Sequence, residues 1–219
     1  MGKETKIVLP FYKLAYAVSF IVILSLIRGV TYTYEIGIAL EAPMAMLVTV
    51  FCADTYVQEI VSKRSEVHRL YPMKKRVCSI GKRLLIQSAF LLLLAVIGYG
   101  LFFVFQKPYT HPITENEAKQ FAVYFFAITV TTFFWGVLSN TLSLVFRNMW
   151  AGIGGCLLLW LSTYSAGGER YLGAWNLFSY SFRNIEGHGG VTWIYGKVLS
   201  IGVYVVLLAG LPKILEERG

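Results

Sequence analysis

The sequence predicts an all-α protein with six membrane-spanning helices, because of its composition, its long apolar segments and the placement of its basic residues. Of the 219 residues, 56% are hydrophobic and only 15% are charged, and the mean hydropathy is +0.60. An ordinary soluble domain has a far smaller apolar fraction and more charge. The composition therefore predicts a single transmembrane domain over residues 1–219.

Six segments account for the predicted spans. A helix needs about 20 largely apolar residues to cross the hydrocarbon core of a bilayer, since its backbone must satisfy its own hydrogen bonds there. The segments are residues 14–34, 36–55, 84–105, 121–146, 150–165 and 191–211. The second is interrupted by Glu41 and Pro43, and the fifth is cut short by Gly167 and Gly168.

The basic residues predict the orientation of these spans. The formal net charge is +8, and fourteen of the 20 Lys and Arg residues fall on one side of the predicted membrane. Basic loops resist translocation, so this side is cytoplasmic and both termini lie there. We therefore expect a multi-pass protein of a plasma membrane, bacterial in type, whose positive charge reflects topology. A nucleic-acid-binding role is not indicated.

Two regions flank the spans without being ordinary loops. Residues 1–13 place five apolar side chains among three lysines, which fits either an interfacial helix at the inner surface or a frayed basic tail. Residues 166–190 form an aromatic-rich outer loop. Such a loop is expected to dip into the membrane edge, as a re-entrant segment, or to pack on protein.

The longest inner connection, residues 54–83, contains eight of the basic residues and an amphipathic pattern. Its apolar residues recur at roughly helical spacing and stop at Tyr71–Pro72, which predicts a short cytosolic helix. Such a helix could lie on anionic lipid or insert its apolar face into a groove of a partner protein, and Glu59 and Glu66 favour the partner. The apolar positions are Val57, Ile60, Val61, Val67 and Leu70.

Several of these residues resemble a known family. Gln58–Glu59, then Leu70-Tyr71-Pro72, then Lys74-Lys75-Arg76 and Lys82 are similar to the cytosolic stretch of type-two ABC exporter permeases. The stretch from Asn140 to Trp160 resembles that family's turn between the fourth and fifth spans; it includes Leu144, Phe146, Arg147–Asn148, Gly152, Gly154 and Gly155.

The resemblance implies the membrane subunit of an ATP-driven exporter. Two permease subunits, as a homodimer or with a sister permease, would dock on two ATP-binding cassette subunits. ATP and Mg would bind those partners, and this chain, which has no GxxxxGK[ST] motif, would need no cofactor and catalyse nothing itself. The coupling contacts to the ATPase would come from Gln58, Glu59, Val61, Val67, Leu70 and Tyr71.

The expected substrate is amphipathic or hydrophobic: a peptide, a toxin or an antibiotic, phenol-soluble modulins included. The rival interpretation from another class is a non-transporting membrane protein, such as an immunity or sensor subunit that sequesters a toxin or relays a signal. The apolar face between residues 54 and 71 separates the two, because a purely sequestering protein has no need of it.

Three intramembrane charges are candidates for a gate. Arg28 lies in the first predicted span, where an unpaired charge costs about 2.5–3.5 kcal/mol on insertion scales. Glu41, across the short outer turn, is its expected partner. Lys197 lies in the sixth span. Each residue has a functional interpretation, as a gate or pathway charge, and a structural one, as a helix-pinning pair or a side chain that reaches the interface.

Hydrolytic and metal-dependent functions are not indicated. The sequence has no HExxH or GxSxG motif, and its three histidines fall on different sides of the predicted membrane. The three cysteines are widely spaced and form no CxxC pair. Neither a metal site nor a disulfide framework is expected.

Overall fold

The computed structural model describes residues 5, 7–61, 72–109, 116–183 and 191–218, and these are almost entirely helical. An isolated bridge between Tyr32 and Tyr109 is the β pairing within those ranges. The elements are α2 (Phe11–Ile27), α3 (Thr33–Cys52), α4 (Val57–Val61), α6 (Met73–Gln106), α7 (Glu117–Phe146), α8 (Met149–Tyr164), α9 (Ala166–Leu172), the 3₁₀ turn η2 (Gly173–Trp175) and α10 (Trp193–Arg218).

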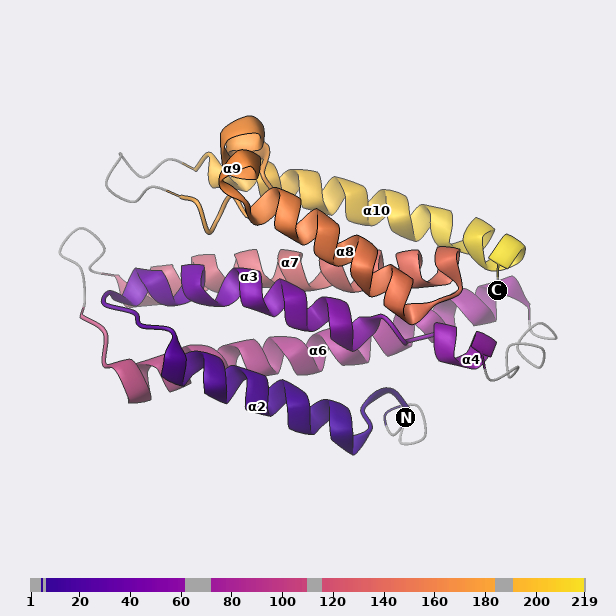
Figure 1. Ribbon diagram of the computed structural model, residues 1–219, viewed down its shortest axis with the longest axis horizontal. Helices are drawn as coiled ribbons and strands as arrows, with labels where there is room; N and C mark the ends of the chain where they lie inside the picture. Colours follow the sequence, from indigo (N-terminus) through magenta and orange to yellow (C-terminus); the bar gives the residue numbers. More distant parts are fainter. Residues whose placement is uncertain (1–4, 6, 62–71, 110–115, 184–190, 219) are drawn as a thin grey trace.

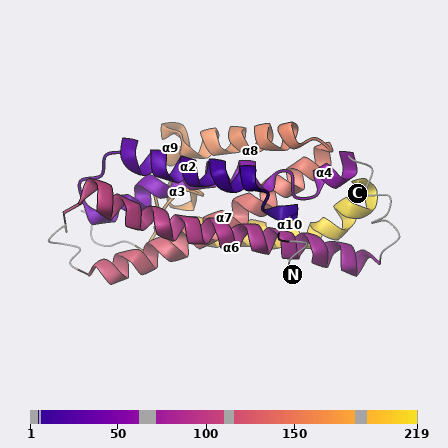
Figure 2. The same cartoon turned by 90° about the horizontal axis from the view of Figure 1, so that it is seen from below.

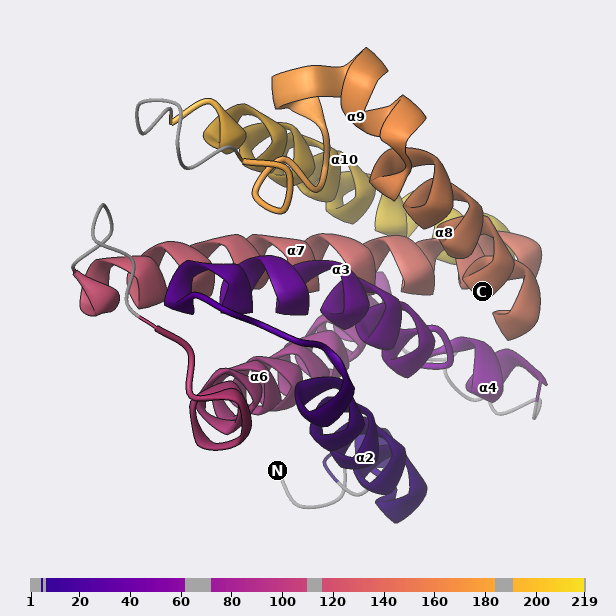
Figure 3. The same ribbon diagram turned by 60° about the vertical axis from the view of Figure 1, so that its left-hand side comes forward.

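The long helices lie roughly antiparallel in three layers (Figures 1 and 3). Helices α2 and α6 form the first layer, and Figure 2 shows them side by side. Helices α3 and α7 form the middle layer, and α8, α9 and α10 cover its other face. Because successive helices alternate in direction, α2 begins at the end of the bundle where α10 stops, together with α4 and the start of α6.

Among the residues that the structure describes, four helices are long and apolar enough to cross a membrane: α3, α6, α7 and α10. Helices α2 and α8 are equally apolar but have only 17 and 16 residues, about 25 Å of helix each. The four helices differ in how many of their residues are buried. In the most apolar 18-residue window, 72% of the residues are buried in α3 and only 17% in α10. Helix α3 is therefore central to the bundle, whereas α10 presents much of its apolar surface outward.

The first predicted span is too long at its outer end. Helix α2 stops at Ile27, and the chain then runs extended to Tyr32. There it pairs with the connection after α6: the amide of Thr33 donates to the carbonyl of Tyr109 (3.1 Å), and the amide of Tyr109 donates to the carbonyl of Thr31 (2.9 Å). These hydrogen bonds give the extended backbone partners that a further helical turn would otherwise have supplied.

The third predicted span, in contrast, is too short at its inner end. Helix α6 begins at Met73 and runs unbroken for 34 residues, so the basic residues up to Arg83 belong to the same helix as the apolar part. Pro72 stands at its N-cap, a place where proline's missing amide proton costs nothing. The predicted inner connection 54–83 is thus helical over its last eleven residues.

Candidate functional site

A carboxylate and an ammonium group meet inside the bundle. Glu41 lies about 12 Å along α3 from Thr33, and Lys197 lies about 6 Å along α10 from Trp193. Both residues are fully buried, with relative exposures of 0%. Lys197 Nζ donates to Glu41 Oε1, so the two charges form a buried salt bridge between the central helix and the most exposed one.

The surrounding hydrogen bonds use every donor of Lys197 and give Glu41 two further donors. Lys197 Nζ also donates to Thr131 Oγ1 on α7 (2.8 Å) and to the carbonyl of Leu177 (2.9 Å). Thr131 in turn donates its hydroxyl to Glu41 Oε1 (3.1 Å), and Ser181 donates to Glu41 Oε2 (2.5 Å). All three ammonium protons therefore have acceptors, which is what a buried ion pair needs to offset its desolvation.

The segment that supplies Leu177 and Ser181 is a buried loop, defined here as residues 176–182. Asn176 fixes its start, because its side-chain amide donates to the carbonyl of Thr163 (2.8 Å) and its Oδ1 accepts from the amide of Phe178 (2.8 Å). Phe178 is fully buried and stacks on Trp135 of α7, with ring centroids 5.7 Å apart. This part of the predicted outer loop thus packs into the bundle between α7, α8 and α10.

Two close approaches hold the buried loop in place. A Cβ at Gly196 would lie 1.9 Å from the carbonyl oxygen of Asn176, and a Cβ at Gly37 would lie 2.2 Å from the hydroxyl of Tyr180. Burial raises the pKa of the Tyr180 phenol, while the neighbouring Arg183 opposes the shift. The hydroxyl of Tyr180 therefore stays protonated at neutral pH.

The expected pairing of Arg28 with Glu41 is wrong. Arg28 is the C-cap of α2 and is only partly buried, and within the described residues it forms no salt bridge. Glu35, on the same outer turn, instead accepts hydrogen bonds from the backbone amides of Thr31 (2.8 Å) and Tyr32 (3.1 Å). Because α2 ends at Ile27, Arg28 lies at the end of the bundle, where its side chain has no need of a buried counterion.

The predicted coupling segment is described only over its first part. Gln58, Glu59 and Val61 belong to α4, but the side chains of Gln58 and Val61 lie outside the described part of the chain. Val67, Leu70 and Tyr71 lie outside the described residues altogether.

Glu59 on α4 forms a salt bridge with Arg83 of α6. Tyr56 and Val57 at the start of α4 are buried against the rest of the chain. The guanidinium of Arg76 lies 3.4 Å from the Tyr56 hydroxyl and 3.3 Å from the carbonyl of Leu215 on α10. Polar contacts therefore join α4 and the preceding Tyr56 to α6, and α6 in turn to α10, at the basic end.

The basic end also holds a buried lysine that the sequence analysis did not single out. Lys13 of α2 is only 4% exposed; it forms a salt bridge with Asp54, just beyond α3, and donates to the carbonyl of Phe51 (2.9 Å). The sequence offered one signal for it, a lysine at the start of an apolar helix. It offered none for Asp54 as the partner, because the contact joins residues 41 positions apart.

Four buried polar side chains of α7 have no hydrogen-bond partner in the described part of the chain: Thr132, Asn140, Thr141 and Ser143. Asn140 on α7 is fully buried, and neither its amide nitrogen nor its oxygen makes a hydrogen bond there. Asn176, equally buried, uses both. No group of three or more metal-ligating side chains occurs among the described residues.

Comparison with known proteins gives no relative. No protein-family model, curated protein or solved structure matches this chain. The site therefore has to be interpreted from its own geometry.

Proposed function

We propose that this chain is the membrane-spanning permease subunit of an ATP-driven exporter that moves an amphipathic or hydrophobic substrate, with ATP hydrolysed on a separate partner. The observation that carries the proposal is the layout of the basic end. The starts of α2 and α6, the end of α10 and the element α4 gather there. This end also holds Lys74, Lys75, Arg76, Lys82 and Arg83, the basic run that begins α6.

Under this proposal the basic end faces the cytoplasm and all six long helices cross the bilayer, with both termini inside. The two short helices, at about 25 Å, fall slightly below the usual hydrocarbon thickness of about 30 Å. Local bilayer thinning accommodates a mismatch of this size at a modest cost. A homodimer, or a pair with a sister permease, would complete the transport path.

The contacts of α4 support a role in coupling. A movement imposed on α4 by an ATPase would pass to α6 through the Glu59–Arg83 salt bridge. It would also reach α10 through Tyr56 and Arg76, whose guanidinium lies within hydrogen-bonding distance of Leu215. Two long helices would thereby tilt together, as alternation between inward-facing and outward-facing states requires.

Co-expression with the ATPase encoded nearest to this chain tests the proposal. Purification in detergent should yield a complex of two permease subunits and two ATPases that hydrolyses ATP. Val67→Asp should abolish ATPase docking while leaving membrane insertion intact. Val191→Asp is the matched control, since Val191 is exposed and just precedes α10, which starts at the opposite end of the bundle. Equal complex yields from the two variants would contradict the coupling assignment.

One observation favours a second candidate, a non-transporting immunity or sensor subunit. The buried Glu41–Lys197 pair has its hydrogen bonds satisfied within this chain, and the buried loop lies beside it. A saturated polar cluster of this kind pins helices without needing to open. If the chain purifies alone with every ATPase offered, this second function takes precedence.

A further inference from the structure

A cavity of about 350 Å³ lies at the non-basic end of the bundle, where α9, η2 and the buried loop meet the start of α10. This volume falls within the range of small-ligand pockets. Its lining residues combine two opposite charges, two hydroxyls and two aromatic rings: Glu169, Gly173, Ala174, Ser179, Phe182, Arg183, Thr192 and Trp193.

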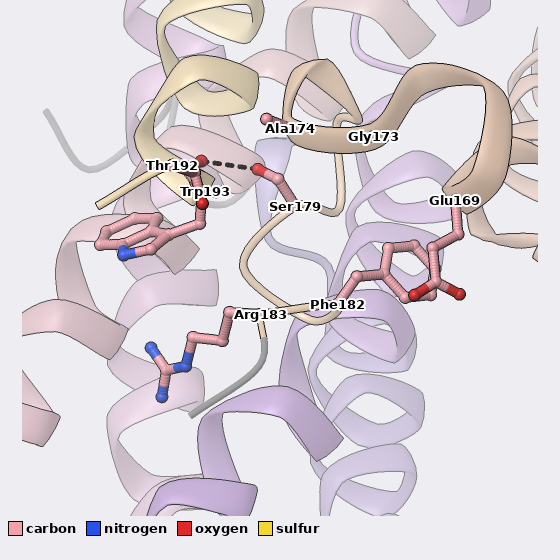
Figure 4. Close-up of a pocket in the computed structure, with 8 residues that line it drawn as sticks. All are labelled: Glu169, Gly173, Ala174, Ser179, Phe182, Arg183, Thr192 and Trp193. Atoms are coloured by element: carbon pink, nitrogen blue, oxygen red, sulfur yellow. Dashed lines mark hydrogen bonds between the residues drawn. The ribbon is translucent and has the colours of Figure 1, made fainter. Parts of the chain in front are cut away.

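The two charged side chains stand on opposite sides of this cavity. Figure 4 shows Arg183 on the side of Trp193, and Glu169 beside Phe182 on the other side. The guanidinium of Arg183 lies over the ring of Tyr180, 3.9 Å from its centroid, which fixes its orientation. Its Nε is buried and has no hydrogen-bond partner within the described ranges. An anionic ligand in the cavity would therefore be bound by the terminal nitrogens of this partly buried, cavity-lining side chain.

The hydroxyls lie along the wall between the two charges. Ser179 Oγ donates to the carbonyl of Trp193 (2.6 Å), which leaves its oxygen free to accept one hydrogen bond. Thr192 is exposed and keeps its donor capacity for a ligand. A group with negative charge at one end and a positive charge at the other therefore finds a complementary partner at each end.

The surroundings place this cavity at the depth of lipid headgroups. Tyr171, Trp175 and Tyr195, which lie within two residues of lining residues in the sequence, are exposed by 88%, 53% and 51%. Exposed Trp and Tyr residues at the end of an apolar bundle mark the membrane interface. The outward face of α10 begins beside the cavity and continues with exposed valines, so acyl chains attached to a bound headgroup would lie along it.

We propose that this cavity binds a phosphoethanolamine headgroup, with the phosphate on Arg183 and the ammonium on Glu169 beside the ring of Phe182. The shared chemistry is a zwitterionic phosphoester, supplied either by a bilayer lipid or by a soluble phosphomonoester. The site requires only that the chain lies in a membrane and is independent of the transport proposal.

Native mass spectrometry of the detergent-purified protein tests the site. Phosphatidylethanolamine and phosphatidylglycerol of identical acyl chains are titrated separately. The wild-type protein should bind one molecule of phosphatidylethanolamine at least about tenfold more tightly than phosphatidylglycerol, because only the former offers Glu169 a cation. Equal binding of the two lipids would overturn the proposal.

Variants assign the contacts. Arg183→Gln should weaken phosphatidylethanolamine binding by about tenfold or more, and Arg183→Lys should restore part of it. Arg170→Gln is the matched control, since Arg170 is an exposed arginine of α9 outside the cavity lining. Unchanged binding in Arg183→Gln, at a melting temperature equal to that of the wild type, would refute the phosphate contact.

Glu169→Gln tests the site even if the Arg183 variants do not fold. Glu169 is exposed, so its replacement should leave folding intact. It should remove the preference for phosphatidylethanolamine over phosphatidylglycerol, and a retained preference would refute the assignment.

Competition with free phosphoethanolamine shows whether the ligand is an intact lipid or a soluble phosphomonoester. Displacement of the bound lipid supports a site that takes the headgroup alone, and persistence of the bound lipid supports one that takes an intact lipid.

Discussion

Lys197→Met removes the cation from the buried pair while keeping a side chain of similar length. Glu41 then keeps the hydroxyl donors of Thr131 and Ser181 but has no counterion at 0% exposure. Removing one partner of a buried ion pair costs about 3–5 kcal/mol, because the remaining charge is desolvated without compensation. We expect Lys197→Met to lower the free energy of unfolding by this amount.

The double variant Glu41→Gln/Lys197→Met isolates the charge from the packing. The glutamine oxygen accepts from one of the two hydroxyls while its NH2 group donates to the other, and no uncompensated charge remains. Replacing both members of a buried pair is often close to neutral, so most of the lost stability should return. The double-mutant cycle should therefore give a coupling energy well above about 0.5 kcal/mol, the limit for independent sites.

The assay is SDS titration of the purified protein in mixed micelles, followed by circular dichroism. Lys119→Met serves as the control, since Lys119 is an exposed lysine near the start of α7. Its unfolding free energy should stay within about 0.5 kcal/mol of the wild-type value. The reasoning fails if the unfolding free energy of Lys197→Met also stays within about 0.5 kcal/mol of the wild-type value. It fails equally if the double variant loses as much stability as the two single variants together.

Two further pairs of variants test the packing around this site by the same titration. Gly196→Ala should destabilise the protein by more than about 2 kcal/mol, because the new methyl group would overlap the carbonyl of Asn176. The control is Gly202→Ala on the same helix. Its methyl group would meet no atom within 4 Å, so this change should be neutral or slightly stabilising. Equal effects at the two glycines would contradict the described seating of the buried loop. Asn140→Leu should raise the unfolding free energy by about 1–3 kcal/mol, since it removes a buried amide without partners, whereas Asn176→Leu should lower it. A loss of stability in Asn140→Leu would show that its amide has a partner in the folded protein.

Helix positions followed from local pattern, with errors at the ends. The apolar runs predicted all six long helices because apolar length is a local property of the chain. The end of α2 was misplaced by several residues because its connection pairs with Tyr109, a contact that no local pattern encodes. The start of α6 was misplaced for the opposite reason: basic residues mark a boundary of apolarity, and a helix continues through them.

The candidate site divides in the same way. Glu41, Lys197 and Arg28 were each predictable as candidates, because charges inside apolar segments are rare and costly. Which of them pair was not predictable. Glu41 and Lys197 are separated by 156 residues, and proximity in sequence pointed instead to Arg28.

The sequence by itself determined that the chain is helical, that its helices are apolar and that its basic residues gather at one end, since composition and periodicity depend only on neighbouring residues. The tertiary structure alone decided that residues 176–182 pack inside the bundle and that Ser181 and Leu177 complete the shell of the buried pair. It also decided which cation meets Glu41. A buried charge is stabilised by whichever groups the packing of helices brings within hydrogen-bonding distance, and that packing is a property of the whole chain.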